Sequence, residues 1–134
     1  MSQTYDHPDG AFSLKLPDDW DHAVQKSTIA FFQPETGVGA LNISAMIPAK
    51  GNIDPATMVV EFAPKSIRPG LQPIDLESPI PGAYVEYEFR GDAWRVWAYR
   101  RRMRVLIISY NCQVSSKGAD DDAVNRIIQS LVVD

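Results

Sequence analysis

Few residues of this chain have types and spacing that could support catalysis. The two histidines, His7 and His22, each follow an aspartate, but no Gly-x-Ser-x-Gly motif accompanies them and their spacing is not that of zinc ligands. A hydrolytic triad needs its base between a nucleophile and an orienting acid in space, which adjacency in sequence does not supply. We therefore expect both histidines to be surface or turn residues.

Carboxylates are the next group that could do chemistry. Glu86 and Glu88 point the same way on one expected strand, about 7 Å apart by strand rise, within the range of glycosidase carboxylate pairs. Arg95 is expected opposite Glu88, and this pair would keep Glu88 ionised, which favours a structural salt bridge over catalysis. Asp120 to Asp122 lack the alternating ligands of a calcium loop, so we expect them to cap a helix.

A cluster of arginines is the strongest candidate for binding. Six of the thirteen basic residues are arginines in one short segment, and the expected hairpin tip carries Arg100 to Arg104. Clustered arginines can hold carboxylates or phosphates with paired hydrogen bonds. The cluster is consistent with a solvated hairpin, with a contact to an acidic protein surface, or with an anionic small molecule. Nucleic acid is disfavoured, because the chain has a net charge of −4 and no recognition motif.

Aromatic residues accompany these arginines. One face of the expected sheet carries tyrosine and tryptophan flanked by arginine, the composition of a protein interface, although a helix of the same chain could cover much of it. The residues predicted to contact a partner are Arg95, Trp97, Tyr99, Arg100, Arg101, Arg102 and Arg104. The residues predicted to line a pocket between sheet and helix are Tyr84, Glu86, Trp97 and Tyr110.

The elements that position these residues follow from periodicity. Alternating apolar residues predict strands over Ala11 to Leu16, Ile29 to Gln33 and Leu41 to Ile47, with Ile47 on the buried side of the last. Asp54-Pro55 predicts a helix start, with the Asp54 side chain as N-cap, and the helix runs to about Ala63. An edge strand is expected near Leu71 to Glu77. Val124, Ile127, Ile128 and Leu131 form the apolar stripe of a C-terminal helix.

Three consecutive strands from about Gly82 form the centre of the expected sheet. A turn at Gly91-Asp92 would place Phe89 opposite Trp94 and Glu88 opposite Arg95. A second turn at Arg102-Met103 would place Trp97 opposite Ile108, although a longer loop there would shift this register. Both faces of these strands are rich in apolar residues, so we expect the sheet to be covered on both sides.

This order of elements resembles the PsbP-like superfamily. The resemblance covers nearly the whole chain and rests on the opening strand followed by LPDDW, the strands containing YVEYEF, and the terminal helix VNRIIQSLVV. The superfamily includes Ran-binding Mog proteins, photosystem extrinsic P subunits and bacterial DcrB-like domains. The resemblance implies an α/β/α sandwich. The family is largely non-enzymatic and several of its members dock to other proteins, so the resemblance assigns no catalytic residue to this chain. Some cytosolic DcrB-like members are chaperones for secreted effectors, a parallel that rests on fold analogy.

Composition limits the remaining possibilities. A chain of 134 residues with 45% hydrophobic and 22% charged residues is expected to form one domain, residues 1–134. The single cysteine, Cys112, excludes an internal disulfide and is expected to pack as a small core residue. No signal peptide or membrane span is visible, so a cytoplasmic location is expected.

These observations predict an α+β fold: an antiparallel sheet of about six strands with helices on both faces and a C-terminal helix. The function predicted is a non-catalytic cytoplasmic module without cofactor or metal that binds another protein, with a homodimer as one form. The alternative is a small-ligand binder, or an enzyme of unrecognised type, that uses the pocket between sheet and helix.

Overall fold

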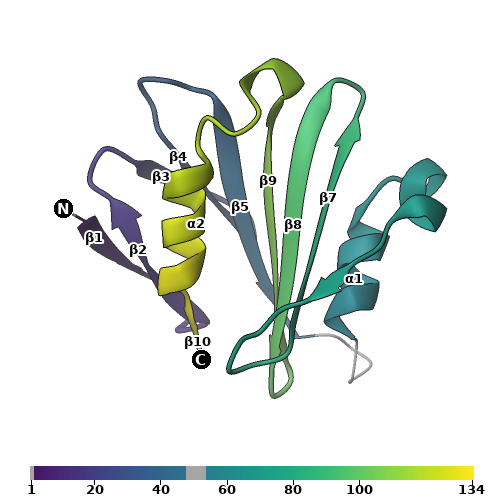
Figure 1. Cartoon of the computed structure of the whole chain (residues 1–134). Coiled ribbons are helices and arrows are strands. Elements are labelled where there is room, and N and C mark those ends of the chain that lie inside the picture. Colours follow the sequence, from purple (N-terminus) through teal and green to yellow (C-terminus); the bar gives the residue numbers. More distant parts are fainter. Residues whose placement is uncertain (1, 48–53) are drawn as a thin grey trace.

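The computed structural model describes residues 2–47 and 54–134. These residues form two antiparallel sheets, one of three strands in the order β1-β2-β10 and one of seven in the order β3-β4-β5-β9-β8-β7-β6 (Figure 1). The strands are β1 (Ser2–Asp6), β2 (Phe12–Pro17), β3 (Asp21–Gln25), β4 (Thr28–Phe32), β5 (Gly39–Met46), β6 (Ile74–Asp75), β7 (Gly82–Phe89), β8 (Asp92–Arg101), β9 (Arg104–Gln113) and β10 (Val132–Val133). The helices are α1 (Pro55–Phe62), α2 (Asp121–Ser130) and the short 3-10 helices η1 (Lys65–Gly70) and η2 (Val114–Ser116).

The register of the central strands is partly as predicted. In β8 and β9, Arg101 lies opposite Arg104 and Trp97 opposite Ile108, which confirms the turn at Arg102-Met103. The β7–β8 prediction is wrong by two residues, because the turn is Arg90-Gly91 rather than Gly91-Asp92. Both turn residues have positive φ, 51° and 85°, the conformation of a type I′ hairpin turn.

This correction changes the ion pairs but not the faces. Glu86, not Glu88, lies opposite Arg95, and Phe89 lies opposite Asp92. Because side chains alternate with a period of two, a slip by two residues leaves every side chain on its predicted face. The assignment of apolar residues to the two sides of the sheet therefore holds, while the predicted salt bridge between Glu88 and Arg95 does not.

The core lies on both faces of the seven-stranded sheet. On one face, Val59 of α1 packs against Val85, Val96 and other small aliphatic residues of β7, β8 and β9. On the other face, the large side chains of β8 and β9 pack against Val124 and Ile127 of α2 and against the apolar side of β2. The second face is thus covered by a helix together with the small sheet, which Figure 1 shows side by side.

The α+β class is confirmed, but the described residues contain ten strands in two sheets rather than about six in one. Periodicity missed β1 and β3, because these are edge strands whose side chains are mostly exposed and polar. Two finer predictions are also corrected. Ile47 follows β5 and is 65% exposed rather than buried, and Asp54 is the N-cap of α1 but makes no side-chain capping hydrogen bond.

Candidate functional site

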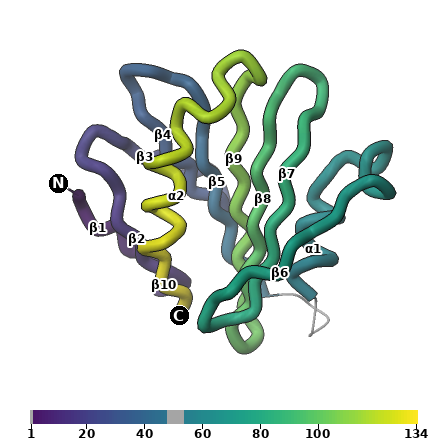
Figure 2. The backbone as a smooth tube through the Cα atoms, in the orientation of Figure 1, coloured from purple at the N-terminus to yellow at the C-terminus, as the bar shows by residue number. Residues whose placement is uncertain are grey.

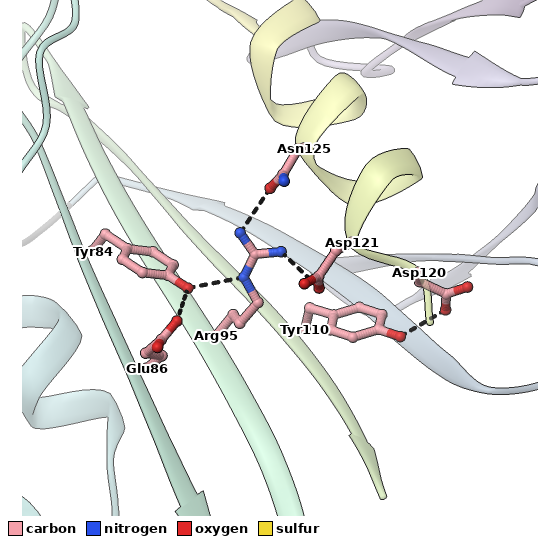
Figure 3. Close-up of polar contacts among 7 residues, drawn as sticks. All are labelled: Tyr84, Glu86, Arg95, Tyr110, Asp120, Asp121 and Asn125. Atoms are coloured by element: carbon pink, nitrogen blue, oxygen red, sulfur yellow. Dashed lines mark hydrogen bonds and ion pairs between the residues drawn. The ribbon is translucent and has the colours of Figure 1, made fainter. Parts of the chain in front are cut away.

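Arg95 is the centre of a polar network that joins the sheet to α2 (Figure 3). Its Nε donates to the hydroxyl of Tyr84 at 2.9 Å, and its Nη2 donates to Oδ1 of Asn125 at 2.7 Å. Its Nη1 lies 3.3 Å from Oδ1 of Asp121. The guanidinium carbon is also 4.7 Å from the centroid of the Trp97 ring. Arg95 therefore contacts polar or aromatic side chains of β7, β8 and α2, and these contacts hold α2 against β8.

Two tyrosines carry this network to carboxylates on either side. The Tyr84 hydroxyl donates to Oε2 of Glu86 at 2.7 Å, and the Tyr110 hydroxyl donates to Oδ2 of Asp120 at 2.6 Å (Figure 3). Burial, then the hydrogen bond to Glu86, raises the pKa of Tyr84 to about 12, partly offset by Arg95. Burial and the hydrogen bond to Asp120 likewise raise the pKa of Tyr110. Both phenols stay protonated at neutral pH and act as hydrogen-bond donors.

The aspartate run before and within α2 has a different role from the one predicted. Asp120 is the N-cap residue of α2 but makes no side-chain capping bond, because its carboxylate accepts from Tyr110. Asp121 pairs with Arg95, while Asp121 and Asp122 in the first turn suit the helix dipole as expected. No group of three or more metal-ligating side chains occurs among residues 2–47 and 54–134.

A hollow of about 410 Å³ lies beside the network, between β7, β8, β9 and the turn that precedes α2. Its charged side chains include Glu86, Glu88, Arg95, Lys117 and Asp121. Lys117 pairs with Glu88 at 3.4 Å, the partner that replaces the predicted Arg95. The apolar part includes Tyr110 and Cys112. Cys112 is buried as predicted, and burial raises the pKa of its thiol, so it is a poor nucleophile.

The predicted pocket residues do not all reach this hollow. Glu86 and Tyr110 line it, whereas Tyr84 does not line it and packs against Arg95, and Trp97 is 4% exposed in the core. Sequence reasoning missed Asn125 and Lys117. Asn125 follows Asp121 by four residues, which places both on one face of α2, and this spacing was the available signal.

The predicted partner-binding residues are divided among four environments, the last of which is the hairpin tip described below. Trp97 and Tyr99, at 4% and 8% exposed, are buried in the core and offer too little surface for a protein contact. Arg95 is occupied by the network described above. Arg100 lies on the α1 face of β8, opposite in direction to Arg101, and is half-buried.

The remaining arginines form the tip of the β8–β9 hairpin. Arg101 and Arg104 lie directly opposite each other, and each donates to a backbone carbonyl, Arg101 to Val133 at 3.0 Å and Arg104 to Gly10 at 3.4 Å. Arg102 is exposed, with φ of 57°. Met103 beside it is 70% exposed, and Ile47 at the end of the neighbouring β5 is 65% exposed. We call Arg101 to Arg104 together with Met46 and Ile47 the hairpin tip.

Solved structures from several organisms share this fold. PsbP from the cyanobacterium Synechocystis aligns with a TM-score of 0.71 at 11% identity, over 99% of this chain and 92% of that protein. A protein from Bacteroides thetaiotaomicron aligns with a TM-score of 0.69 at 18% identity, over 98% of this chain and 48% of that protein. This chain therefore spans about half the length of the Bacteroides protein. LpqN from Mycobacterium tuberculosis, which is involved in cell envelope biogenesis, aligns with a TM-score of 0.52 at 21% identity, over 99% of this chain and 90% of that protein.

These comparisons confirm the predicted PsbP-like fold, and at such identities they show the fold alone. No protein-family model matches the chain, and no curated protein sequence matches it. No helix among the described residues is long and apolar enough to cross a membrane.

Proposed function

We propose that the protein is a non-catalytic module that binds another protein through the hairpin tip. The observation that carries the proposal is the exposure of Met103, 70%, between two arginines. Exposed methionine adapts its shape to a partner, and arginine forms paired hydrogen bonds with carboxylates. Apolar anchors beside arginine are the composition of binding hot spots. With Trp97 and Tyr99 buried, the contact consists of the tip itself.

The charge of the tip indicates the chemistry of the partner. The chain has a net charge of −4, yet three arginines project at this one end of the sheet. An acidic surface with an apolar recess for Met103 would match it. Two copies meeting tip to tip would bring like charges together, which disfavours a homodimer through this surface. The similarity to PsbP and LpqN supports the fold on which the tip is presented, and any likeness in function would be analogy.

The test is an affinity pull-down of the tagged protein from its source cells, read by mass spectrometry. The variant is R102E/M103A, which leaves the contacts of Arg101 and Arg104 intact. The matched control is R90E, because Arg90 is also an exposed arginine with positive φ in a hairpin turn. It lies at the other end of β8, about 30 Å away by strand rise.

A stoichiometric partner that binds the wild type and R90E, and is lost from R102E/M103A, would support the proposal. A partner retained by R102E/M103A would refute the tip as its contact surface. Light scattering on the same variants reports the oligomeric state. A dimer that persists in R102E/M103A would show that self-association uses another face.

A second candidate is a small-ligand site in the hollow beside Arg95. Its volume of about 410 Å³ lies in the range of ligand pockets, and two predicted residues, Glu86 and Tyr110, line it. The polar groups there already hydrogen-bond one another, so a ligand would compete with them. A thermal-shift screen with the wild type and E88Q tests this candidate. Ligands whose shift is unchanged in E88Q and in other variants of the lining would refute it.

A further inference from the structure

A second hollow of about 460 Å³ lies further along α2 than the Arg95 network, at the C-terminal end of the helix. It separates residues 76–80, which follow β6, from the end of α2 and β10. Figure 2 shows these two walls as the loop after β6 and the chain near the C-terminal end. We call this hollow the C-terminal groove. None of the residues that line it takes part in the network described above.

The C-terminal groove is mainly apolar. Tyr99 and Val133, both buried, form its floor, and Ile128 and Leu131 at the end of α2 form one wall. Val132 lies on the rim and is 53% exposed. An aliphatic surface open to water at this size suits an apolar chain rather than a polar ligand.

A guanidinium and a carboxylate are the only charged groups among the described lining residues. Arg101 is fixed at the Val133 end, because its Nη1 donates to the Val133 carbonyl at 3.0 Å. A guanidinium carries five N–H donors, so most remain for a second acceptor. The carboxylate is that of Glu77, which is exposed on the opposite wall and makes no described ion pair with Arg101. Arg102 and Arg104 add positive charge beside Arg101.

An extended peptide is disfavoured as the occupant. β10 is the edge of the three-stranded sheet, so a peptide strand would have to add along it. The carbonyl of Val133 accepts from Arg101, so the guanidinium occupies one of its two acceptor sites and would crowd a strand paired there. An aliphatic chain makes no such demand, because it has no backbone to pair.

We propose that the C-terminal groove binds a single-chain amphiphile with a carboxylate head, a fatty acid. The chain lies over Tyr99, Ile128 and Leu131, and the carboxylate accepts from Arg101. This site shares Arg101 with the hairpin tip, but the partner contact is tested at Arg102 and Met103, which do not line the groove, so the two proposals can fail independently. Each methylene that the groove fully buries strengthens binding about fourfold, and half burial about twofold.

The test is a titration of the whole chain with dodecanoate labelled with ¹³C at the carboxyl carbon, below its micelle concentration, followed by NMR. We expect saturable one-to-one binding, weaker for octanoate by about twofold to fourfold per methylene removed. R101Q should weaken binding about tenfold, since a hydrogen bond to a charged group is lost. V132D should weaken it further by placing a carboxylate on the rim, and its exposed position lets the chain fold. R90Q is the control and should bind as the wild type does.

Dodecylammonium distinguishes the head group from the chain. If it binds as tightly as dodecanoate, Glu77 or the apolar surface alone governs binding and the proposal is overturned. The absence of saturable dodecanoate binding, or equal affinity in R101Q and the wild type, would also overturn it. Loss of partner capture by R102E/M103A with dodecanoate binding retained would support both proposals separately.

Discussion

Replacing Arg95 with methionine should destabilise the protein substantially, because its side chain links the sheet to α2. The substitution keeps an unbranched apolar stem of similar length and removes the guanidinium. The Arg95 side chain is 20% exposed, and its guanidinium hydrogen-bonds Tyr84, Asp121 and Asn125 while stacking on Trp97. The loss would leave the first turns of α2 held to the sheet by packing and by the hydrogen bond from Tyr110 to Asp120.

The magnitude follows from the exposure of each partner. Asp121 is 49% exposed, so its pair with Arg95 contributes about 0.5 kcal/mol after screening by solvent. Tyr84 is half-buried and Asn125 exposed, and their hydrogen bonds to a charged donor contribute about 1.5 and 0.5 kcal/mol. Stacking on the buried Trp97 adds about 0.5–1 kcal/mol. The free energy of unfolding should therefore fall by about 3 kcal/mol, and Tm by about 10 °C.

Urea denaturation followed by circular dichroism measures this loss. The control is K117M, which breaks an ion pair between two exposed side chains, Lys117 and Glu88, and should cost less than about 0.5 kcal/mol. Tyr84→Phe combined with R95M should cost less than the two changes summed, because both remove the same hydrogen bond. A loss below about 1 kcal/mol in R95M, or equal to that of K117M, would refute the role of Arg95 as the link between sheet and helix.

Three further predictions follow from single positions. A Cβ at Gly39 would lie 2.6 Å from the backbone oxygen of Asn111, so G39A should lower the free energy of unfolding, measured by urea denaturation, by about 2 kcal/mol. A Cβ at Gly70 would have nothing within 4 Å, so the free energy of unfolding of G70A should stay within about 0.5 kcal/mol of the wild-type value. Arg90 has φ of 51° at the first position of a type I′ turn, a conformation that asparagine adopts more readily than arginine. R90N should therefore raise the free energy of unfolding by about 0.5–1 kcal/mol. An unchanged value would contradict the assignment of a type I′ turn. The pKa of Tyr84 rises from 10.0 in the unfolded chain to about 12 when folded, so its contribution to stability is complete below pH 10 and is lost as the pH rises to about 12. Urea denaturation at fixed pH values should show that Y84F loses less stability than the wild type between pH 10 and about 12. An identical loss of stability in the two proteins would contradict this prediction.

The candidate site shows where sequence reasoning was sufficient. The faces of β7, β8 and β9 were predictable because pleating alternates side chains with a fixed period, and even the two-residue error at the β7–β8 turn kept Tyr84, Arg95 and Tyr110 on one side. The apolar stripe of α2 was predictable for the same local reason, since Val124 and Ile127 recur at helical spacing and are both buried. The glycine in Arg90-Gly91 sits where a type I′ turn favours it, a signal that the chosen register overlooked.

Other features depended on how distant segments dock. Trp97 and Tyr99 have the composition of an interface, but α2 and β2 cover them, and no pattern within β8 specifies that cover. Arg95 lies opposite Glu86 yet pairs with Asp121 and Asn125, 26 and 30 residues away in sequence. The edge strands β1 and β3 are polar, and their conformation comes from pairing with β2 and β4.

The sequence alone thus determined the α+β class, the two faces of the central strands and the C-terminal helix, because the periods of strand and helix are properties of the local backbone. The tertiary structure alone decided which aromatic residues are buried, which carboxylate each arginine meets, and that the exposed arginines gather beside Met103 and the C-terminal groove. Those outcomes depend on contacts between segments far apart in the chain, whose energies are set by packing and desolvation once the elements have docked.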